Sequence, residues 1–345
     1  MLAIGTCSLS VAQVPSDSPQ PVPATKAIIA AFERVPIVAI ADLHGLQQNH
    51  DFIASLVRDP DLPNKINDIV VEFGNAKYQA IIDRYTNGDN VPIAELRQVW
   101  RNTIGAGNNP STDAPIYPRF FATVREVNRS LPAPRRLRVL LGDPPIDWSK
   151  VKDRKDIFFW GSQRDSHFAE VVEKQVLSKG RKALLIAGGY HLFHNPAPTP
   201  SDFFDNVVSL LERHHPGQVL VIMTHRGFGP RNGELEPRLS SWPNPGMALI
   251  RDTWLGLLDA QLVFPPSQIV MVGPDGKPAP NPLERVKLSD IVDAYLYLGP
   301  RGSLTISTPP PEVYQDKEYM QELERRSKLM GTPTVGGPAV EQRKP

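Results

Sequence analysis

Short apolar segments alternate with amphipathic segments over most of the chain from residue 26 onward. The apolar segments are continuous runs of Val, Ile and Leu, which is typical of strands buried on both faces of a parallel sheet. They lie at residues 35–41, 68–73, 137–142, 183–187, 219–224 and 294–298. Segments with helical periodicity lie between them, at residues 47–58, 75–86, 92–101, 117–130, 162–179 and 201–213. This order predicts an α/β fold, a mostly parallel open sheet with helices on both faces.

Two later regions interrupt this alternation. Residues 227–285 are rich in Pro and Gly, which predicts an insertion in the α/β domain or a lid. Within this insertion we expect a weak helix near residues 247–258 and a hairpin around Pro274, Asp275 and Gly276. Beyond it, residues 314–330 predict a charged helix that is followed by a disordered tail.

The first residues of the chain resemble the end of a secretory signal. They are apolar and then rich in Pro and Ser, and Ser10, Val11 and Ala12 have the small side chains of a cleavage site. We therefore expect an exported protein, periplasmic or secreted, and Cys7 leaves open a membrane-anchored lipoprotein. No stretch has the roughly 20 apolar residues of a membrane span. The expected organisation is a signal-like segment and linker at 1–25, an α/β domain at 26–305, and a charged helix with a tail at 306–345.

Charge and cysteine content narrow the choice of partner. The chain has 38 basic and 37 acidic residues, a net charge of +1, so no strong field attracts it to nucleic acid. A small molecule is the expected ligand. The single cysteine, Cys7, excludes an internal disulfide and a Cys-based zinc cluster, so a divalent metal would need His and carboxylate ligands.

Ionisable side chains end or follow five of the predicted strands. They are His44, Glu72, Asp143, His191 and His225. The carboxyl ends of parallel strands meet at one edge of an open α/β sheet, where ligands bind between loops on a rigid scaffold. We therefore expect His44, Glu72 and His191 to converge in one pocket at this edge.

Each of these side chains also has a purely structural interpretation. Glu72 lies inside a buried strand, and an unpaired buried carboxylate costs several kcal/mol, so it needs a His, Arg or metal partner. That partner could belong to a structural ion pair. Asp143 precedes two prolines and could be a turn residue, and His225 could be a histidine of a surface loop.

A further group comes from the segment after Gly161. If a helix begins near Ser162, Arg164 and His167 share a face of its first turns and can point into the pocket, with Asp165 beside them. The alternative is a solvated pair of Arg164 with Asp165, which contributes little to stability.

Five short motifs occur in an order that resembles a known superfamily. They are His44-Gly45, Glu72-Phe73-Gly74-Asn75, Gly142-Asp143, Arg164-Asp165 and Gly188-Gly189-Tyr190-His191. Over about residues 30–305 the chain is similar to the erythromycin esterase/ChaN-like superfamily, which includes the Tiki-type proteases. The resemblance implies an α/β fold with a polar pocket at the strand ends. Members include esterases, metal-dependent peptidases and a haem-binding protein of iron uptake.

The resemblance assigns the first-motif histidine to His44 and the second-strand glutamate to Glu72. The helical Arg-Asp motif matches Arg164 and Asp165, and the late histidine matches His191. The chain departs from the first motif, which is usually Gly-Glu-x-His, because Asp42 replaces the glutamate and shortens the carboxylate by one methylene.

Two functional hypotheses follow. In the first, the protein hydrolyses an ester or peptide bond: His44 or His191 activates water, Glu72 stabilises the imidazolium, and Arg164 stabilises the oxyanion. A metal version uses His44, Glu72 and His191 as ligands of a divalent ion. In the second, Tyr190 and His191 bind haem or an iron chelate for uptake, as both side chains can be axial ligands.

Overall fold

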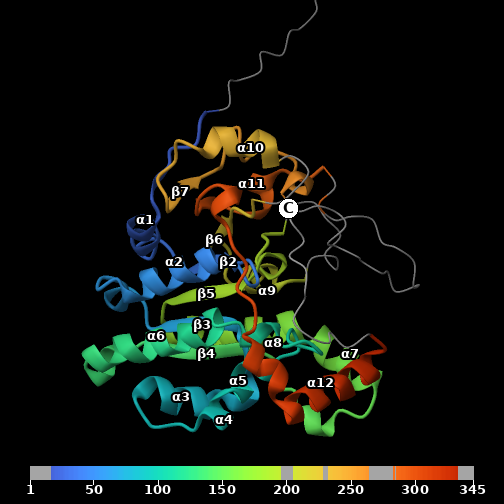
Figure 1. The fold of residues 1–345 in the computed structure, drawn as a ribbon. Helices are drawn as coiled ribbons and strands as arrows, with labels where there is room; N and C mark the ends of the chain where they lie inside the picture. The colour runs from blue at the N-terminus through green and yellow to red at the C-terminus, as the bar shows by residue number, and fades with distance from the viewer. Residues whose placement is uncertain (1–16, 196–204, 228–231, 264–282, 284, 333–345) are drawn as a thin grey trace, which may run out of the picture.

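The computed structural model describes residues 17–195, 205–227, 232–263, 283 and 285–332. Its centre is an eight-stranded sheet of order β1-β7-β8-β6-β2-β5-β3-β4 (Figure 1). The strands are β1 (Val22–Pro23), β2 (Ile37–Asp42), β3 (Asp68–Asn75), β4 (Arg138–Asp143), β5 (Ala183–Gly188), β6 (Val219–Thr224), β7 (Gly246–Leu249) and β8 (Ala294–Tyr297). All six predicted strands are present and run parallel. The two additional strands, β1 and β7, pair antiparallel at one edge.

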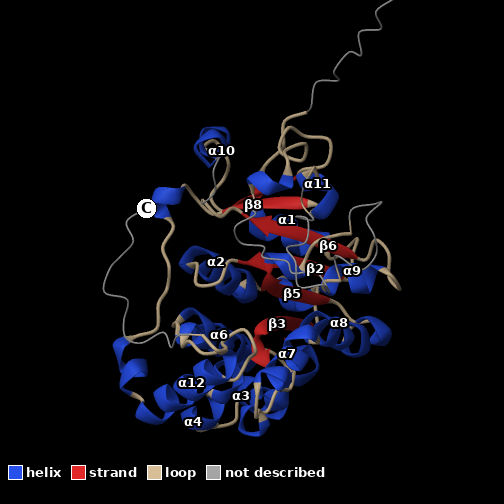
Figure 2. Ribbon diagram, turned by 90° about the vertical axis from the view of Figure 1, so that its right-hand side faces the viewer, coloured by secondary structure: helices blue, strands red, loops and turns tan. Residues whose placement is uncertain are grey.

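Helices cover both faces of the sheet, as predicted (Figure 2). They are α1 (Ala24–Ala31), α2 (Gln47–Arg58), α3 (Gln79–Asn87), α4 (Ile93–Leu96), α5 (Gln98–Arg101), α6 (Ile116–Ser130), α7 (Arg154–Ser162), α8 (Arg164–Gln175), α9 (Val207–Glu212), α10 (Asn232–Leu239), α11 (Leu288–Ile291) and α12 (Lys317–Met330). The α/β fold class predicted from the sequence is therefore confirmed.

The continuous apolar runs are explained by two cores, one on each face of the sheet. Alternate residues of a strand point to opposite faces. In β2, Val38 and Ile40 pack into the core under α2 and α6, whereas Ile37 and Ala39 pack into the core under α8 and α9. Both sets are fully buried, so neither face can carry polar side chains until the strand ends.

Two local predictions are corrected. The segment expected to be a weak helix near 247–258 instead contributes β7, which pairs with β8, and then continues in turns. Backbone pairing with a neighbouring strand outweighs the weak helical pattern. The helix expected at 162–179 is α8, which ends at Gln175, and the sequence did not predict the separate helix α7 that precedes it and ends at Ser162. The hairpin around Asp275 and the C-terminal tail lie outside the described residues.

Helix α12 reaches back to the segment that follows α5. Arg101 lies between Asp113 and Asp316, with its Nε 2.9 Å from Oδ2 of Asp113 and its Nη1 2.8 Å from Oδ2 of Asp316. Arg326 of α12 donates through Nη1 to the carbonyl of Arg101 at 2.9 Å. The described C-terminal helix is thus tied to the α/β domain by the ion pair of its N-cap residue Asp316 with Arg101 and by a buried hydrogen bond from Arg326. Within the described residues, no helix combines the length and apolar character that crossing a bilayer requires.

Candidate active site

Four neighbouring strands, β2, β5, β3 and β4, bring the predicted side chains together at their carboxyl ends. His44 follows β2, His191 follows β5, Glu72 lies near the end of β3, and Asp143 is the last residue of β4. The chain passes from β2 to β3 and later returns to insert β5 between them. This crossover places the strand that His191 follows between the strand that His44 follows and the strand that carries Glu72.

The carboxylate of Glu72 is the centre of this group. Its Oε1 lies 2.5 Å from Nη2 of Arg164, and its Oε2 accepts the backbone N–H of Gly188 at 2.6 Å. Oε1 also lies 3.4 Å from Nε2 of His191 and 3.8 Å from Nε2 of His44. Burial raises the pKa of Glu72, but the positive charges of His191, His44 and Arg164 outweigh it and hold the pKa well below its usual range.

His44 is oriented by a buried carboxylate. Oδ2 of Asp42 lies 3.1 Å from Nδ1 of His44, and its Oδ1 lies 2.9 Å from Nε2 of His50 in α2. The shorter side chain at position 42 therefore still reaches the imidazole. Because an ionised carboxylate can only accept, Nδ1 of His44 carries a proton and Nε2 faces the pocket.

The pKa of His44 reflects these neighbours. Burial lowers it, but the charge of Glu72 and the hydrogen bond to Asp42 outweigh this effect and raise the pKa to about 9. The side chain is 61% exposed, so water reaches one side of the ring and screens part of this effect.

His191 is held in a similar way from the other side. Its Nδ1 lies 2.6 Å from Oδ1 of Asp165 in α8, so Asp165 fixes the ring while Nε2 faces Glu72. Burial lowers the pKa of His191, but the charge of Glu72 and the bond to Asp165 raise it to about 10. Both imidazoles are therefore protonated at neutral pH in the free protein.

Arg164 joins the end of β4 to the end of β3. Its Nε donates to Oδ1 of Asp143 at 3.1 Å and its Nη2 contacts Glu72. Asp143 is buried, and its Oδ2 accepts the N–H of Ile104 at 2.6 Å, so it is not a solvent-facing turn residue. Burial raises the pKa of Asp143 to about 6, against the opposing charge of Arg164.

Two of the predicted residues lie apart from this group. Nδ1 of His167 lies 3.0 Å from the carbonyl oxygen of Gly142. His225 is buried rather than on a surface loop, and its ring contacts the hydroxyl of Tyr295 at 2.8 Å and Glu236 at 3.0 Å. Neither ring contacts Glu72 in the described structure.

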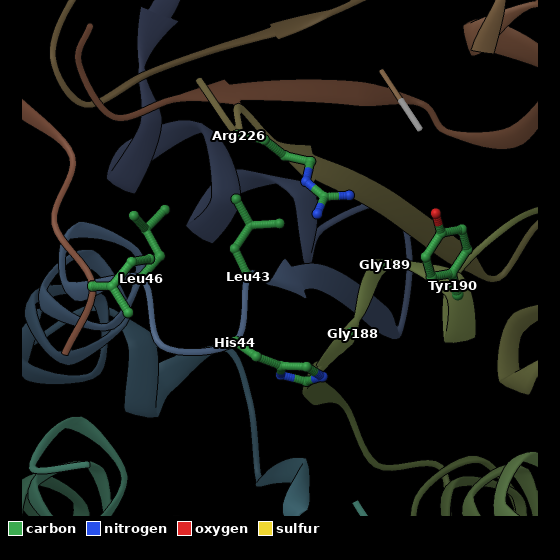
Figure 3. A pocket seen from close by; sticks show the side chains of 8 residues that line it. Leu43, His44, Leu46, Gly188, Gly189, Tyr190 and Arg226 are labelled. Atoms are coloured by element: carbon green, nitrogen blue, oxygen red, sulfur yellow. The ribbon is translucent and has the colours of Figure 1, made fainter. Parts of the chain in front are cut away.

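Two pockets meet at His44. The first, called here the Glu72 pocket, has a volume of about 80 Å³ and is lined by His44, Glu72, Thr103, Thr112, Tyr117 and Arg164, among others. The second, the Tyr190 pocket, has a volume of about 250 Å³ and is lined by Leu43, His44, Leu46, Tyr190, Arg226 and Ile306, with Gly188 and Gly189 (Figure 3). In Figure 3 the imidazole of His44 lies beside Gly188, where the two pockets meet.

The predicted metal ligands do not fit a metal centre as they are arranged. The guanidinium of Arg164 contacts the Glu72 oxygen that both Nε2 atoms face, so a cation already occupies this position. Among the residues that the structure describes, no group of three or more His, Cys, Asp or Glu side chains could hold a metal ion.

The predicted haem ligands face different surroundings. Tyr190 lines the Tyr190 pocket, whereas His191 is not among the residues that line it. Both ring nitrogens of His191 face carboxylates, those of Asp165 and Glu72. The two side chains therefore do not offer axial ligands to one common pocket.

The sequence did not predict four residues at this site. Tyr117 lies in the first turn of α6, and its hydroxyl accepts the N–H of Gly45 at 3.3 Å. Thr112 lies in a short 3₁₀ helix, Ser111–Asp113, between α5 and α6. His50 lies in α2 and contacts Asp42. Gly188 leaves room for the site, because a Cβ there would stand 3.1 Å from Nε2 of His44 and 3.2 Å from Oε2 of Glu72. Of these four residues, only Gly188 could have been identified from the sequence, because it belongs to the pair Gly188-Gly189 that precedes His191.

Comparison with known proteins supports the fold. No family model and no curated protein matches the chain. A crystal structure of a protein from Bacillus cereus superimposes with a TM-score of 0.52 at 10% identity, over 85% of this chain and 97% of the other.

Two further matches are a mutant of the erythromycin esterase EreC in its open conformation and ChaN of Campylobacter jejuni with cofacially bound haem. The EreC structure has a TM-score of 0.48 and 12% identity, over 79% of this chain and 92% of that one. The ChaN structure has a TM-score of 0.35 and 13% identity, over 59% and 86%. The chain therefore has the α/β fold of the Bacillus cereus protein.

Proposed function

We propose that this protein is a hydrolase that uses water to cleave an ester or peptide bond at the carboxyl edge of its sheet. The observation that supports this proposal is the position of Nε2 of His44. It faces a buried glutamate in a pocket that also contains the guanidinium of Arg164. A base, a carboxylate that stabilises its cation and an oxyanion donor are the groups that acyl transfer to water requires.

In this mechanism Nε2 of neutral His44 takes a proton from water as the water oxygen attacks the carbonyl carbon. Asp42 keeps the other nitrogen protonated, and Glu72 stabilises the imidazolium that forms. Arg164 uses two of its five N–H donors on Asp143 and Glu72, so others can stabilise the tetrahedral oxyanion. When the intermediate collapses, the leaving group takes the proton from His44, and an acid and an alcohol or amine are released.

His44 is favoured over His191 as the base. His44 lines both pockets, whereas His191 lines neither of them and is held between Asp165 and Glu72. We assign His191 a positioning role, in which its charge and its bond to Asp165 hold the Glu72 carboxylate in place.

The pH dependence of the reaction follows from this assignment. The base must be neutral, and the pKa of His44 is raised to about 9, so only a small fraction is active at neutral pH. We expect kcat/KM, measured in buffers from about pH 6 upward, to rise close to tenfold per pH unit and to level off near pH 9. A profile that is already flat at pH 7 would contradict the role of His44 as the base.

The close contact at Gly188 gives a second prediction. In Gly188→Ala the new Cβ would stand 3.1 Å from Nε2 of His44, so the imidazole must move away. The imidazole need give by only a few tenths of an ångström, so we expect kcat/KM to fall by roughly tenfold, less than the 10² that a displacement of about 1 Å can cost, with a small change in melting temperature. Gly161→Ala is the control, since a Cβ at that position meets no atom within 4 Å. Equal rates in both variants would place Gly188 outside the site.

The function itself is tested with purified protein and a panel of p-nitrophenyl esters and peptide amides. Release of product should depend on Glu72, and Glu212→Gln provides the control. Glu212 contacts His194 at a different pocket, lined by Val35 and Val219 at the amino ends of β2 and β6. Titration with haem in the same experiment tests the alternative function. A stoichiometric Soret shift without hydrolysis would replace the hydrolase proposal with a haem-binding one.

A further inference from the structure

The Glu72 pocket and the Tyr190 pocket differ in size and in lining. The Glu72 pocket, at about 80 Å³, is bordered by charged groups and by hydroxyl-bearing side chains such as Thr103 and Tyr117. The Tyr190 pocket, at about 250 Å³, has the apolar side chains of Leu43, Leu46 and Ile306 on its walls. Ordinary ligand pockets measure about 300–1,000 Å³, so the smaller one has room for a group of only a few non-hydrogen atoms.

The polar groups of the Glu72 pocket suit the carbonyl end of a substrate. The Tyr117 hydroxyl accepts the N–H of Gly45, and among the described residues no acceptor is found for its own proton. Burial and the neighbouring carboxylates raise the pKa of Tyr117 well above its usual range, so the phenol stays protonated. Its O–H and the guanidinium of Arg164 are two donors bordering the same small space.

A second part of the wall of the Glu72 pocket is tied to the rest of the structure. It contains Thr112, whose neighbour Asp113 accepts hydrogen bonds from Nε1 of Trp100 and Nε of Arg101, both at 2.9 Å. Arg101 is in turn bound to Asp316. A wall anchored by buried charges cannot easily move outward, so the size of the pocket limits what it can bind.

We infer that the Glu72 pocket is an acyl site for short acyl groups of about acetyl size, and that the Tyr190 pocket receives a larger, mainly apolar leaving group. This inference rests on the proposed hydrolase function and specifies its substrate class. His44 borders both pockets, so its Nε2 lies where the bond between the acyl group and the leaving group would be.

The test uses p-nitrophenyl acetate, butanoate and octanoate, which share one apolar leaving group. We expect kcat/KM to be highest for acetate and to fall by at least about tenfold towards octanoate, because even one misplaced methylene can cost 10-fold to 200-fold. Equal or rising rates with chain length, still abolished by Glu72→Gln, would overturn the acyl site and leave the hydrolase function standing.

Two variants at Thr112 distinguish the effect of the volume of the pocket from the effect of the Thr112 hydroxyl. Thr112 is buried, and its hydroxyl has no hydrogen-bond partner in the described structure. Thr112→Val preserves the volume and should keep both the fold and the preference for acetate. Thr112→Ala widens the pocket and should shift the preference towards butanoate. Thr86→Val is the control, as it alters a buried hydroxyl in α3 that bonds to Ile82. An unchanged preference in Thr112→Ala would contradict the inference.

A binding measurement keeps the inference testable if no ester is cleaved. The absence of any Glu72-dependent hydrolysis would refute the hydrolase function. The size of the pocket would then be tested by titrating acetate, butanoate and octanoate and following the imidazole resonance of His44 by NMR. A larger shift with acetate than with octanoate supports a short-acyl site. The reverse order, or no shift with any of the three, overturns it.

Discussion

Glu72→Gln is expected to lower the plateau value of kcat/KM by about 10²–10⁴, the contribution that acid–base catalysis usually makes. The amide has the same shape as the carboxylate but no charge to stabilise the His44 imidazolium. A shift of the pH–rate profile would show that the lower rate comes from the lost charge of Glu72. Without the charge of Glu72, the pKa of His44 should fall from about 9 towards its ordinary value, so the rising limb of the pH–rate profile should move to lower pH.

The fold should survive this substitution. The amide oxygen can accept only one of the two donors that Glu72 now binds, Gly188 N–H and Arg164 Nη2, so the free energy of unfolding should fall by roughly 1–3 kcal/mol. Arg164 keeps Asp143 as its partner. Chemical denaturation and the pH–rate profile are measured together, with Glu212→Gln as the control. If the rising limb of the pH–rate profile does not move and kcat/KM stays at the parental value, Glu72 has no role in the mechanism.

Arg164→Lys is expected to lower kcat by about 10²–10³, the usual loss when one oxyanion donor is removed. Lysine keeps the positive charge, but it lacks the planar fork with which Arg164 binds Asp143 and Glu72 at once. An ammonium group that satisfies the two carboxylates has fewer donors left for the oxyanion. The effect should therefore appear in kcat more than in KM.

The matched control for this variant is Arg138→Lys. Arg138 also pairs with a buried carboxylate, because its Nε lies 2.9 Å from Oδ1 of Asp68, but this pair lies at the opposite edge of the sheet. Both variants should lose some stability, and only Arg164→Lys should lose activity. If both retain the parental rate, Arg164 has a purely structural role.

The sequence predicted those parts of the fold that depend on local pattern. Continuous apolar runs identified six strands, and the ionisable residues at their ends identified the edge of the sheet at which His44, Glu72 and His191 meet. Position along a parallel strand is enough for that inference, because the carboxyl ends of such strands share an edge. Asp143 was predicted there by the same reasoning, whereas Arg164 was predicted from its place on the first turns of a helix expected to begin near Ser162.

Other features depend on contacts that leave no periodic signal. The position of Thr112 is fixed by its neighbour Asp113, which binds Arg101, and Arg101 in turn binds Asp316, a residue distant in sequence. The antiparallel strand β7 forms because β8 offers it an edge. The break between α7 and α8 occurs at Gln163, a residue that is neither Pro nor Gly.

The bond between Arg101 and Asp316 also has a consequence for biosynthesis. These residues are 215 positions apart, so the ribosome completes β2, β3, β4 and β5 long before it makes the partner that anchors the loop of Thr112. A nascent chain can assemble the carboxyl edge of the sheet while this wall still lacks its anchor. The wall gains this anchor only when Asp316 and Arg326 have left the ribosome.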